Sequence, residues 1–290
     1  MNIALVIGAA ILGAAMGSFA VAQVWRLRAR QLAEDKKAGH PVDAAEMKRL
    51  RPLLKVKKLR QDRSVCLSCG HQLEWYDLLP VVSWVSLGGR CRYCRQPIGW
   101  TEVLAELGLG GLFALSVCWW PWAHSSLSGL LLSLWLVALV LLTILFIYDL
   151  KWYLLPDVIM LPLIIVAIIF AALQLMQSTQ LVGQIWSLIG AVGLLAGLYT
   201  GLYLVSGGAW VGFGDVKLGL GLALLLGHWP LAFLTLFLAN LLGTLIVLPG
   251  ILRGVLQRTT KIPFGPLLIA GFLIAWFCGR HILAWYMTLV

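Results

Sequence analysis

Residues 127–148 read LSGLLLSLWLVALVLLTILFIY, and Asp149 follows directly. This stretch has no charged side chain and is long enough to cross a bilayer as a helix, which takes about 20 apolar residues. The chain as a whole is 61% hydrophobic and only 12% charged. These features predict a membrane protein with helical spans, because a helix satisfies its own backbone hydrogen bonds in lipid.

Working outward, seven further apolar segments lie at 2–24, 102–120, 155–176, 182–206, 215–228, 230–251 and 265–288. The sequence therefore predicts an all-α, polytopic membrane protein of about eight transmembrane helices. No basic residue precedes the first segment and Arg26 follows it, so we expect a retained anchor and not a cleaved signal peptide. We divide the chain into a first transmembrane helix (1–25), a polar segment (26–99) and a membrane domain (100–290).

Basic residues are concentrated in the polar segment. Of the 22 Lys and Arg residues, 16 lie between Arg26 and Arg95. The positive-inside rule makes this segment cytoplasmic, and alternation then makes the connections near 149–154, 207–217 and 252–264 cytoplasmic too. Those connections hold every remaining basic residue except Arg280, namely Lys151, Lys217, Arg253, Arg258 and Lys261. We predict a multi-pass protein of the cell inner membrane whose basic segment faces anionic lipids, with no nucleic-acid partner.

Two aspartates are predicted at the same membrane boundary. Asp149 ends the third span and Asp215 opens the sixth, both on the cytoplasmic side. Two carboxylates that share one proton can hydrolyse a peptide, because the ionised one accepts a proton from water and the protonated one polarises the carbonyl. Gly212 and Gly214 would allow a sharp turn and close approach of a substrate strand. The alternative is an ordinary helix start, with Asp215 favoured by the helix dipole.

Three other acids lie in the membrane domain. Asp157 follows Pro156, a combination that is typical of helix starts. Glu102 suits the first turn of the second span for the same reason. Glu106 lies one turn deeper, and its role stays open between structure and function.

Four of the six cysteines form two CxxC pairs, Cys66 with Cys69 and Cys91 with Cys94. This spacing is typical of closed four-thiolate zinc sites, which stabilise a fold and do not catalyse. Two disulfides are the alternative, and the reducing cytoplasm disfavours them. His71, beside the first pair, is the one histidine to test as another ligand. We therefore predict a small cytoplasmic zinc-binding loop.

The motifs YDL at 148–150, LPD at 155–157 and GFGDVK at 212–217 resemble the signature regions of the prepilin peptidases, or type IV leader peptidases, which are GxGD-type membrane aspartyl proteases. The cytoplasmic loop is also similar to that family's. The resemblance implies that Asp149 and Asp215 are the catalytic pair and that Gly212, Gly214, Lys217 and Asp157 support the motifs. It implies cleavage of leader peptides from pilin or pseudopilin precursors at the cytoplasmic membrane face.

In many members of this family the loop serves a second activity, N-methylation of the new N-terminus with S-adenosylmethionine. The resemblance implies that Glu106 and Arg26 belong to that site. The chain departs from the family pattern at 20–25, where Val21 replaces a typical Asn, and at 101–103. Because both regions are associated with methylation, we expect that activity to be weak or absent.

Two other classes of function stay open. A proton-coupled transporter also uses aspartates in membrane helices, but it predicts acids near the midplane and an internal repeat. A non-catalytic component of pilus or secretion assembly predicts that either aspartate is dispensable.

Overall fold

The structure is a computed structural model that describes residues 3–54, 64–122, 125–254 and 262–288. Within these ranges the regular structure is helical, and the only β-type pairing consists of two isolated bridges. The prediction of an all-α protein is confirmed. The chain forms two compact units, Met1–Cys118 and Trp119–Val290, so the predicted segment 26–99 lies inside the first unit.

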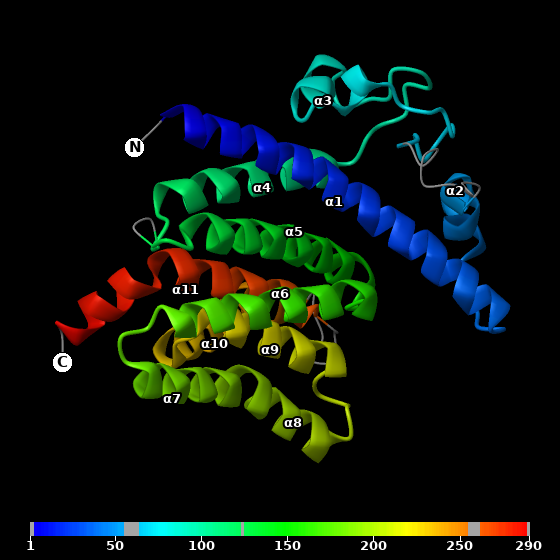
Figure 1. The fold of residues 1–290 in the computed structure, drawn as a ribbon. Coiled ribbons are helices and arrows are strands. Elements are labelled where there is room, and N and C mark those ends of the chain that lie inside the picture. The colour runs from blue at the N-terminus through cyan, green and yellow to red at the C-terminus, as the bar shows by residue number, and fades with distance from the viewer. Residues whose placement is uncertain (1–2, 55–63, 123–124, 255–261, 289–290) are drawn as a thin grey trace. The chain divides into compact units, whose positions relative to one another are not determined.

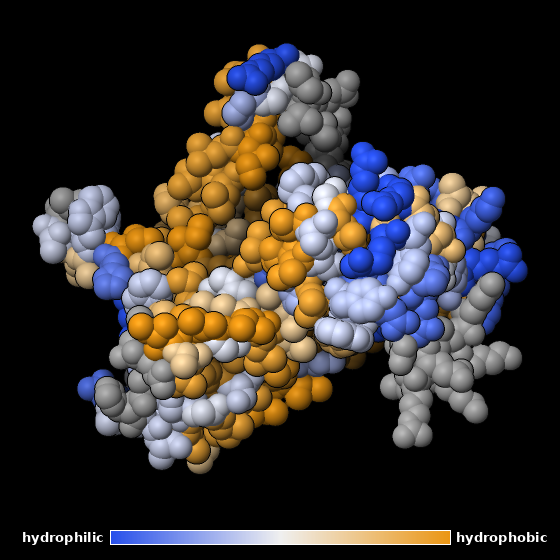
Figure 2. Space-filling model, turned by 90° about the horizontal axis from the view of Figure 1, so that it is seen from above, coloured by the Kyte–Doolittle hydropathy of each residue, from blue (hydrophilic) through white to orange (hydrophobic). Residues whose placement is uncertain are grey.

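Seven described helical stretches are long and apolar enough to cross a membrane, judged by length and composition. They are α1 (Ile3–Lys37), α4 (Trp100–Cys118), α5 (Ser128–Trp152), α6 (Asp157–Met176), the stretch Leu181–Ser206, α10 (Trp229–Leu252) and α11 (Phe264–Met287). Much of the surface seen in Figure 2 is hydrophobic, as helices that face lipid require. The protein is therefore a multi-pass membrane protein.

The sixth predicted segment, at 215–228, is the short helix α9 (Phe213–Leu226), whose 14 residues fall below the length of an ordinary span. Its two ends nevertheless lie at opposite ends of α6. Lys217 pairs with Asp157 at the start of α6, and Gln174 near the end of α6 donates to the Leu225 carbonyl at 3.4 Å. Most of α9 is buried. A short helix is tolerated at membrane depth because protein, and not lipid, surrounds it.

In the first unit, α1 and α4 pack closely through small residues. A Cβ atom on Gly13 would lie 2.6 Å from the Leu109 carbonyl oxygen, and one on Gly17 would lie 2.6 Å from the Ala105 carbonyl oxygen. Such small residues let two helix backbones approach within a membrane. The polar end of α1 packs against α2 (Ala44–Leu54) through Ala29, Leu32 and Leu50. The short helices η2 (Trp75–Leu78) and α3 (Val82–Ser86) follow.

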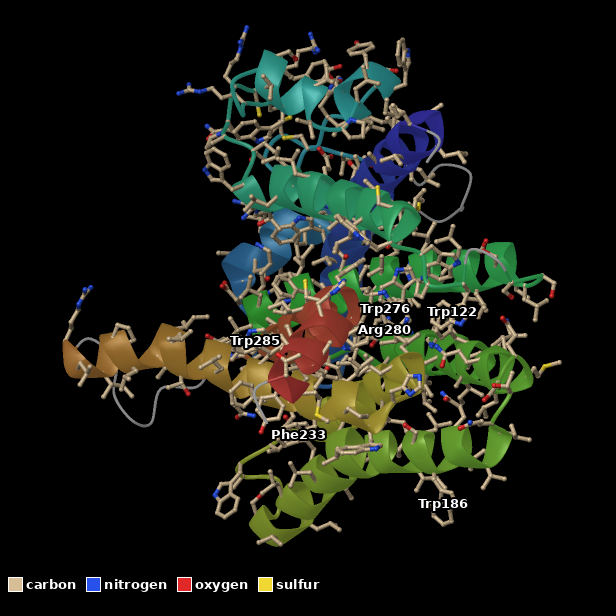
Figure 3. The ribbon with its side chains drawn as sticks, turned by 90° about the vertical axis from the view of Figure 1, so that its left-hand side faces the viewer. Trp122, Trp186, Phe233, Trp276, Arg280 and Trp285 are labelled. Atoms are coloured by element: carbon tan, nitrogen blue, oxygen red, sulfur yellow. The ribbon has the colours of Figure 1, made fainter. Side chains whose placement is uncertain are left out.

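In the second unit, aromatic side chains form part of the core. Trp135 of α5 stacks on Trp276 of α11 with ring centroids 3.8 Å apart, and Trp122 lies 5.9 Å from Trp276. Figure 3 labels Trp122 and Trp276 together with Arg280, which lies one turn further along α11. His228, at the opposite end of α9 from Asp215, interacts electrostatically with Arg280. Arg280, the only basic residue of the membrane domain outside the predicted cytoplasmic connections, is therefore remote from the two aspartates.

The stretch Leu181–Ser206 is helical throughout but changes type in the middle. It comprises α7 (Leu181–Val192), a π-helical segment η3 (Gly193–Gly197) and α8 (Leu198–Ser206). A turn containing Gly207 and Gly208, both with positive φ, then leads to α9. Figure 1 shows α8 and α9 as consecutive helices joined by this turn. A π segment inside an α-helix shifts the register of the residues that follow it.

Candidate active site and metal centre

Asp149 is held at the end of α5 by the backbone of α11. The residue is buried, with 5% of its surface exposed. The Gly265 N–H, in the first turn of α11, donates a hydrogen bond of 3.1 Å to the carboxylate Oδ2. A helix N-terminus stabilises negative charge because its first N–H groups have no partner within the helix. A Cβ atom on residue 265 would lie 2.7 Å from this oxygen, so only glycine leaves room for the carboxylate.

Asp215 lies in the first turn of α9. The Gly212 N–H donates to its Oδ2 at 3.3 Å, and the carboxylate interacts electrostatically with that of Asp149. The structure thus brings together two acids that are 66 positions apart (215 minus 149). Gly212, with φ −76°, is an ordinary cap of α9, and the left-handed turn lies earlier, at Gly207 and Gly208. Gly212 therefore caps α9, as the helix-start interpretation predicts, and the close approach of a substrate strand stays a prediction.

Gly214 has a different reason to be small. A Cβ atom on it would lie 3.0 Å from the Cβ of Leu155, and a Cβ atom on Gly265 would lie 3.6 Å from a methyl group of the same leucine. Leu155 thus contacts the backbone beside Asp215 and the backbone that donates to Asp149. It fixes the spacing of the two helix starts that carry the acids.

Asp157 and Lys217, whose roles the sequence left open, form an ion pair of 2.6 Å between α6 and α9. The Asp157 side chain is 60% exposed, so the pair lies at the edge of the site. The Lys217 ammonium also lies 4.9 Å from the centre of the Phe213 ring. Asp157 is the first residue of α6 and follows Pro156, as expected for a helix start.

Each CxxC pair forms the same knuckle. One isolated bridge encloses each pair: Val65 pairs with Gln72 around the first, and Arg90 pairs with Pro97 around the second. The residue after each pair, Gly70 or Arg95, has a positive φ of 72° or 59°. Its N–H donates back to the carbonyl of the first cysteine at 2.8 Å or 3.0 Å. Two equivalent turns therefore present two sulfur atoms each.

The four sulfur atoms converge. All lie within 4.8 Å of one another, and the Cys66 and Cys94 sulfurs are 3.9 Å apart. A tetrahedral zinc ion with 2.3 Å bonds needs sulfurs about 3.8 Å apart. Burial alone would raise the pKa of the Cys66 thiol, but backbone N–H groups of Cys69 and Ser68 lower it to about 7. For Cys94 the Gln96 backbone lowers the pKa, but burial and hydrogen bonds with the other three thiols raise it to about 12. The residues fit zinc, which binds thiolates.

His71 is not part of this metal-ligand cluster. Its ring stacks on Tyr93 with centroids 3.7 Å apart. Tyr93 in turn donates to Asp77 at 3.1 Å, and Arg92 donates to the same carboxylate at 2.8 Å. Burial would raise the pKa of Asp77, but these hydrogen bonds hold it below its usual value. The network links η2 to the second knuckle and stabilises the loop.

Glu106 is 6% exposed on α4 and accepts a 2.7 Å hydrogen bond from the Val81 N–H. The Ser18 side chain of α1 also contacts this carboxylate. Val81 has φ 61° and ψ −46°, a rare conformation for a β-branched residue. Such strain persists only where its surroundings enforce it, and Glu106 holds the Val81 amide here. Glu106 therefore fixes the loop backbone between η2 and α3.

A cavity of about 180 Å³ lies within the first unit, between α1, α2, α4 and the loop at 64–99 that carries the two CxxC pairs, called the zinc loop below. Charged and aromatic residues line it, including Trp25, Arg26, Arg49, Asp77, Arg92 and Glu102. Arg26 thus faces this cavity, as does Val21, whereas Glu106 is not among its lining residues. Ala20 and Val24 are fully buried, so two of the residues that depart from the family pattern serve packing.

No role for Gly265 was identified from the sequence, and Leu155 was identified only as part of the LPD motif at 155–157. A signal for Gly265 existed, because Pro263 and Pro266 mark the start of a helix at the predicted cytoplasmic boundary. Nothing in the sequence indicated that Leu155 lies between both acids, because that contact depends on how three helices pack.

The chain matches two family descriptions. Residues 11–120 match the "Bacterial Peptidase A24 N-terminal domain", and residues 136–248 match the "Type IV leader peptidase family". It is 35% identical over 236 residues to a prepilin leader peptidase/N-methyltransferase of Aeromonas hydrophila, covering 78% of this chain and 75% of that protein. It is 31% identical over 290 residues to one from Pseudomonas putida, covering 97% and 93%. No solved structure matches the chain.

Proposed function

Because the chain belongs to the type IV leader peptidase family, we propose that it is a membrane aspartyl endopeptidase that cleaves the leader peptide from type IV pilin-like precursors. Asp149 and Asp215 are its catalytic pair. One observation carries the proposal: two carboxylates from different helices interact at one end of the second unit, each held by a backbone N–H at a helix start. The names of the relatives supply the substrate class.

The chemistry follows from the pair. One ionised carboxylate accepts a proton from water as the water oxygen bonds to the scissile carbonyl carbon, while the protonated partner gives its proton to the carbonyl oxygen. The carbon–nitrogen bond then breaks, and the leaving amine takes a proton from the first carboxyl group. The remaining hydroxyl proton returns to the second carboxylate, so the pair ends as it began.

The site suits a substrate anchored in the membrane. A precursor whose apolar N-terminal helix lies in the bilayer would present the end of its leader at the membrane boundary. By the positive-inside argument that boundary is the cytoplasmic face of the inner membrane. Lys217 and Asp157 would stand at the entrance to the pair.

Co-expression with a precursor tests the proposal. Asp149→Asn and Asp215→Asn should each abolish cleavage, seen as a mobility shift on a gel, with unchanged membrane insertion. The double variant should be no worse than either single variant, because the two residues act as one unit. Cleavage by either single variant would remove the pair assignment, and would favour the non-catalytic or transporter alternatives.

The departures at 20–25 and 101–103 led us to expect weak or absent methylation, but the curated relatives carry both activities in their names. We therefore propose N-methylation of the new N-terminus as a second activity, located in the first unit. Its support is the cavity lined by Arg26 and Glu102, together with the relatives' double name. S-adenosylmethionine would supply the methyl group. Its carboxylate, ammonium and sulfonium groups need both basic and acidic partners, which the cavity has, and Trp25 offers an apolar surface. Glu106 would act indirectly, by fixing the strained loop.

Intact mass of the processed product tests this activity. An added CH₂ raises the mass by about 14 Da. We expect Arg26→Ala to give fully cleaved but unmethylated product, because the peptidase residues lie in the other unit. Glu106→Gln retains an acceptor for the Val81 N–H and should keep more methylation than Glu106→Leu, which leaves that amide without one. Cleaved product without added mass from the wild type would contradict the activity.

A further inference from the structure

Tyr199 lies in the second unit with a buried hydroxyl that has no partner. It is the second residue of α8 and is 4% exposed. Among the side chains that the structure describes, its hydroxyl is one of the few buried polar atoms without a hydrogen bond. A buried hydroxyl is stable only when something accepts or donates to it. The Tyr199 hydroxyl therefore needs a hydrogen-bond partner that a water molecule or a bound substrate supplies.

Helix packing directs Tyr199 toward Asp215. Gly219 of α9 packs against the carbonyl oxygen of Leu195 in the π segment. The turn at Gly207 and Gly208 makes the two helices run in opposite directions. One helical turn after Leu195 lies Tyr199 (195 plus 4), and one turn before Gly219 lies Asp215 (219 minus 4). Because the helices are antiparallel, both steps lead to the same end, where the two aspartates lie.

Two further contacts agree with this direction. Tyr199 interacts electrostatically with the Asp215 carboxylate. Its ring also packs edge-on against Phe264, with centroids 5.5 Å apart. Phe264 directly precedes Gly265, whose N–H holds Asp149. Tyr199 thus touches the segment that positions one acid and faces the other.

We propose that the Tyr199 hydroxyl is a third polar member of the peptidase site and donates a hydrogen bond to the scissile carbonyl oxygen. This inference rests on the proposed function. A donor that is already in place stabilises the charge that develops on that oxygen in the transition state. No proton is transferred from the phenol. The bond exists only with substrate bound, which explains why the hydroxyl is otherwise without a partner.

Tyr199→Phe removes the oxygen and keeps the ring against Phe264. With purified full-length protein and a precursor substrate, we expect kcat to fall about 100-fold, as when one donor to such an oxygen is lost, and KM to change less than two-fold. Thermal stability in detergent should stay the same or rise, since no hydrogen bond is lost from the folded protein. The pH dependence of kcat/KM should keep its shape, because the two acids are unchanged.

Tyr203→Phe is the matched control, because Tyr203 lies on the same helix with its ring 5.5 Å from that of Phe213, and it should keep wild-type kcat. Wild-type kcat in Tyr199→Phe would overturn the proposal. A fall in kcat together with a lower melting temperature would assign the hydroxyl a structural role, and a shifted pH profile would assign it to Asp215 itself. Cleavage by the Asp149→Asn variant would instead contradict the proposed peptidase function. The experiment therefore distinguishes a wrong role for Tyr199 from a wrong function.

Discussion

The Asp149 carboxylate leaves no space for a side chain on residue 265, since an added Cβ atom would lie 2.7 Å from its oxygen. We predict that Gly265→Ala reduces cleavage at least about 100-fold, because displacing a catalytic group by about 1 Å has an effect of this size. The measurement is kcat on a precursor substrate. Gly201→Ala is the control, because Gly201 has nothing within 4 Å and should tolerate the methyl group. Equal activity of both variants would contradict the geometry at Asp149.

The Lys217–Asp157 pair should matter less. Asp157 is mostly exposed, and exposed ion pairs contribute about 1 kcal/mol or less to stability. We expect Asp157→Asn to cleave at a rate reduced only several-fold. Lys217→Met should lose a similar amount, and the double variant should lose no more than either, as for two residues that act only through each other. Losses that add in the double variant would show that each residue has a separate role.

Single residues differ in how far the sequence could identify them. Asp149, Asp215 and the CxxC pairs were found because ionisable groups and thiols are informative wherever they occur in a membrane chain. The partners Asp157 and Lys217 were found, but not their pairing, because 60 positions separate them (217 minus 157). Tyr199 carried no signal, since a tyrosine in an apolar segment is ordinary until its hydroxyl is seen without a partner.

At the scale of elements, the zinc loop joins two knuckles that have little secondary structure of their own. A closed metal site supplies folding energy to such a segment. We predict about one zinc per chain and its loss in Cys66→Ser, measured by elemental analysis. Faster proteolysis between α2 and α4 should accompany the loss. Cys118→Ser, in α4 outside the cluster, should keep the metal. Protein without zinc, whose thiols react only after reduction, would indicate disulfides.

The helices themselves were predictable to within a few residues, because a long apolar run specifies a span almost alone. Two features were not. The π segment at Gly193–Gly197 forms where Leu195 meets Gly219, a contact between distant positions. The first helix continues to Lys37, well past the apolar run, because α2 covers Ala29 and Leu32. Tertiary packing decided both, and local sequence could not show it.

At the scale of the whole molecule, the order of the helices puts the starts of α6, α9 and α11 and the ends of α5, α8 and α10 on one side of the membrane. This side carries both aspartates. Of the basic residues that the structure describes in the second unit, Lys151, Lys217 and Arg253 also lie there, and Arg280 does not. Arg258 and Lys261 lie outside the described residues. The clustering of basic residues on one side could be predicted from the sequence. Only the structure shows that the end of α5, Leu155 and the starts of α9 and α11 meet around the two aspartates.

This arrangement predicts the orientation of the active site. In a background without Cys118 and Cys278, a cysteine at Ser126 or Ser178 should react with a membrane-impermeant thiol reagent in whole cells, because both positions lie on the side opposite the aspartates. A cysteine at Leu154, which is 43% exposed and lies between Asp149 and Asp157, should react only after the cells are made permeable. The protein that lacks Cys118 and Cys278 and has no added cysteine is the control. Its four CxxC cysteines should not react in intact cells, because they are predicted to be cytoplasmic. Labelling of Leu154→Cys in intact cells would move the aspartates to the outer face, where a cytoplasmic precursor could not reach them before export.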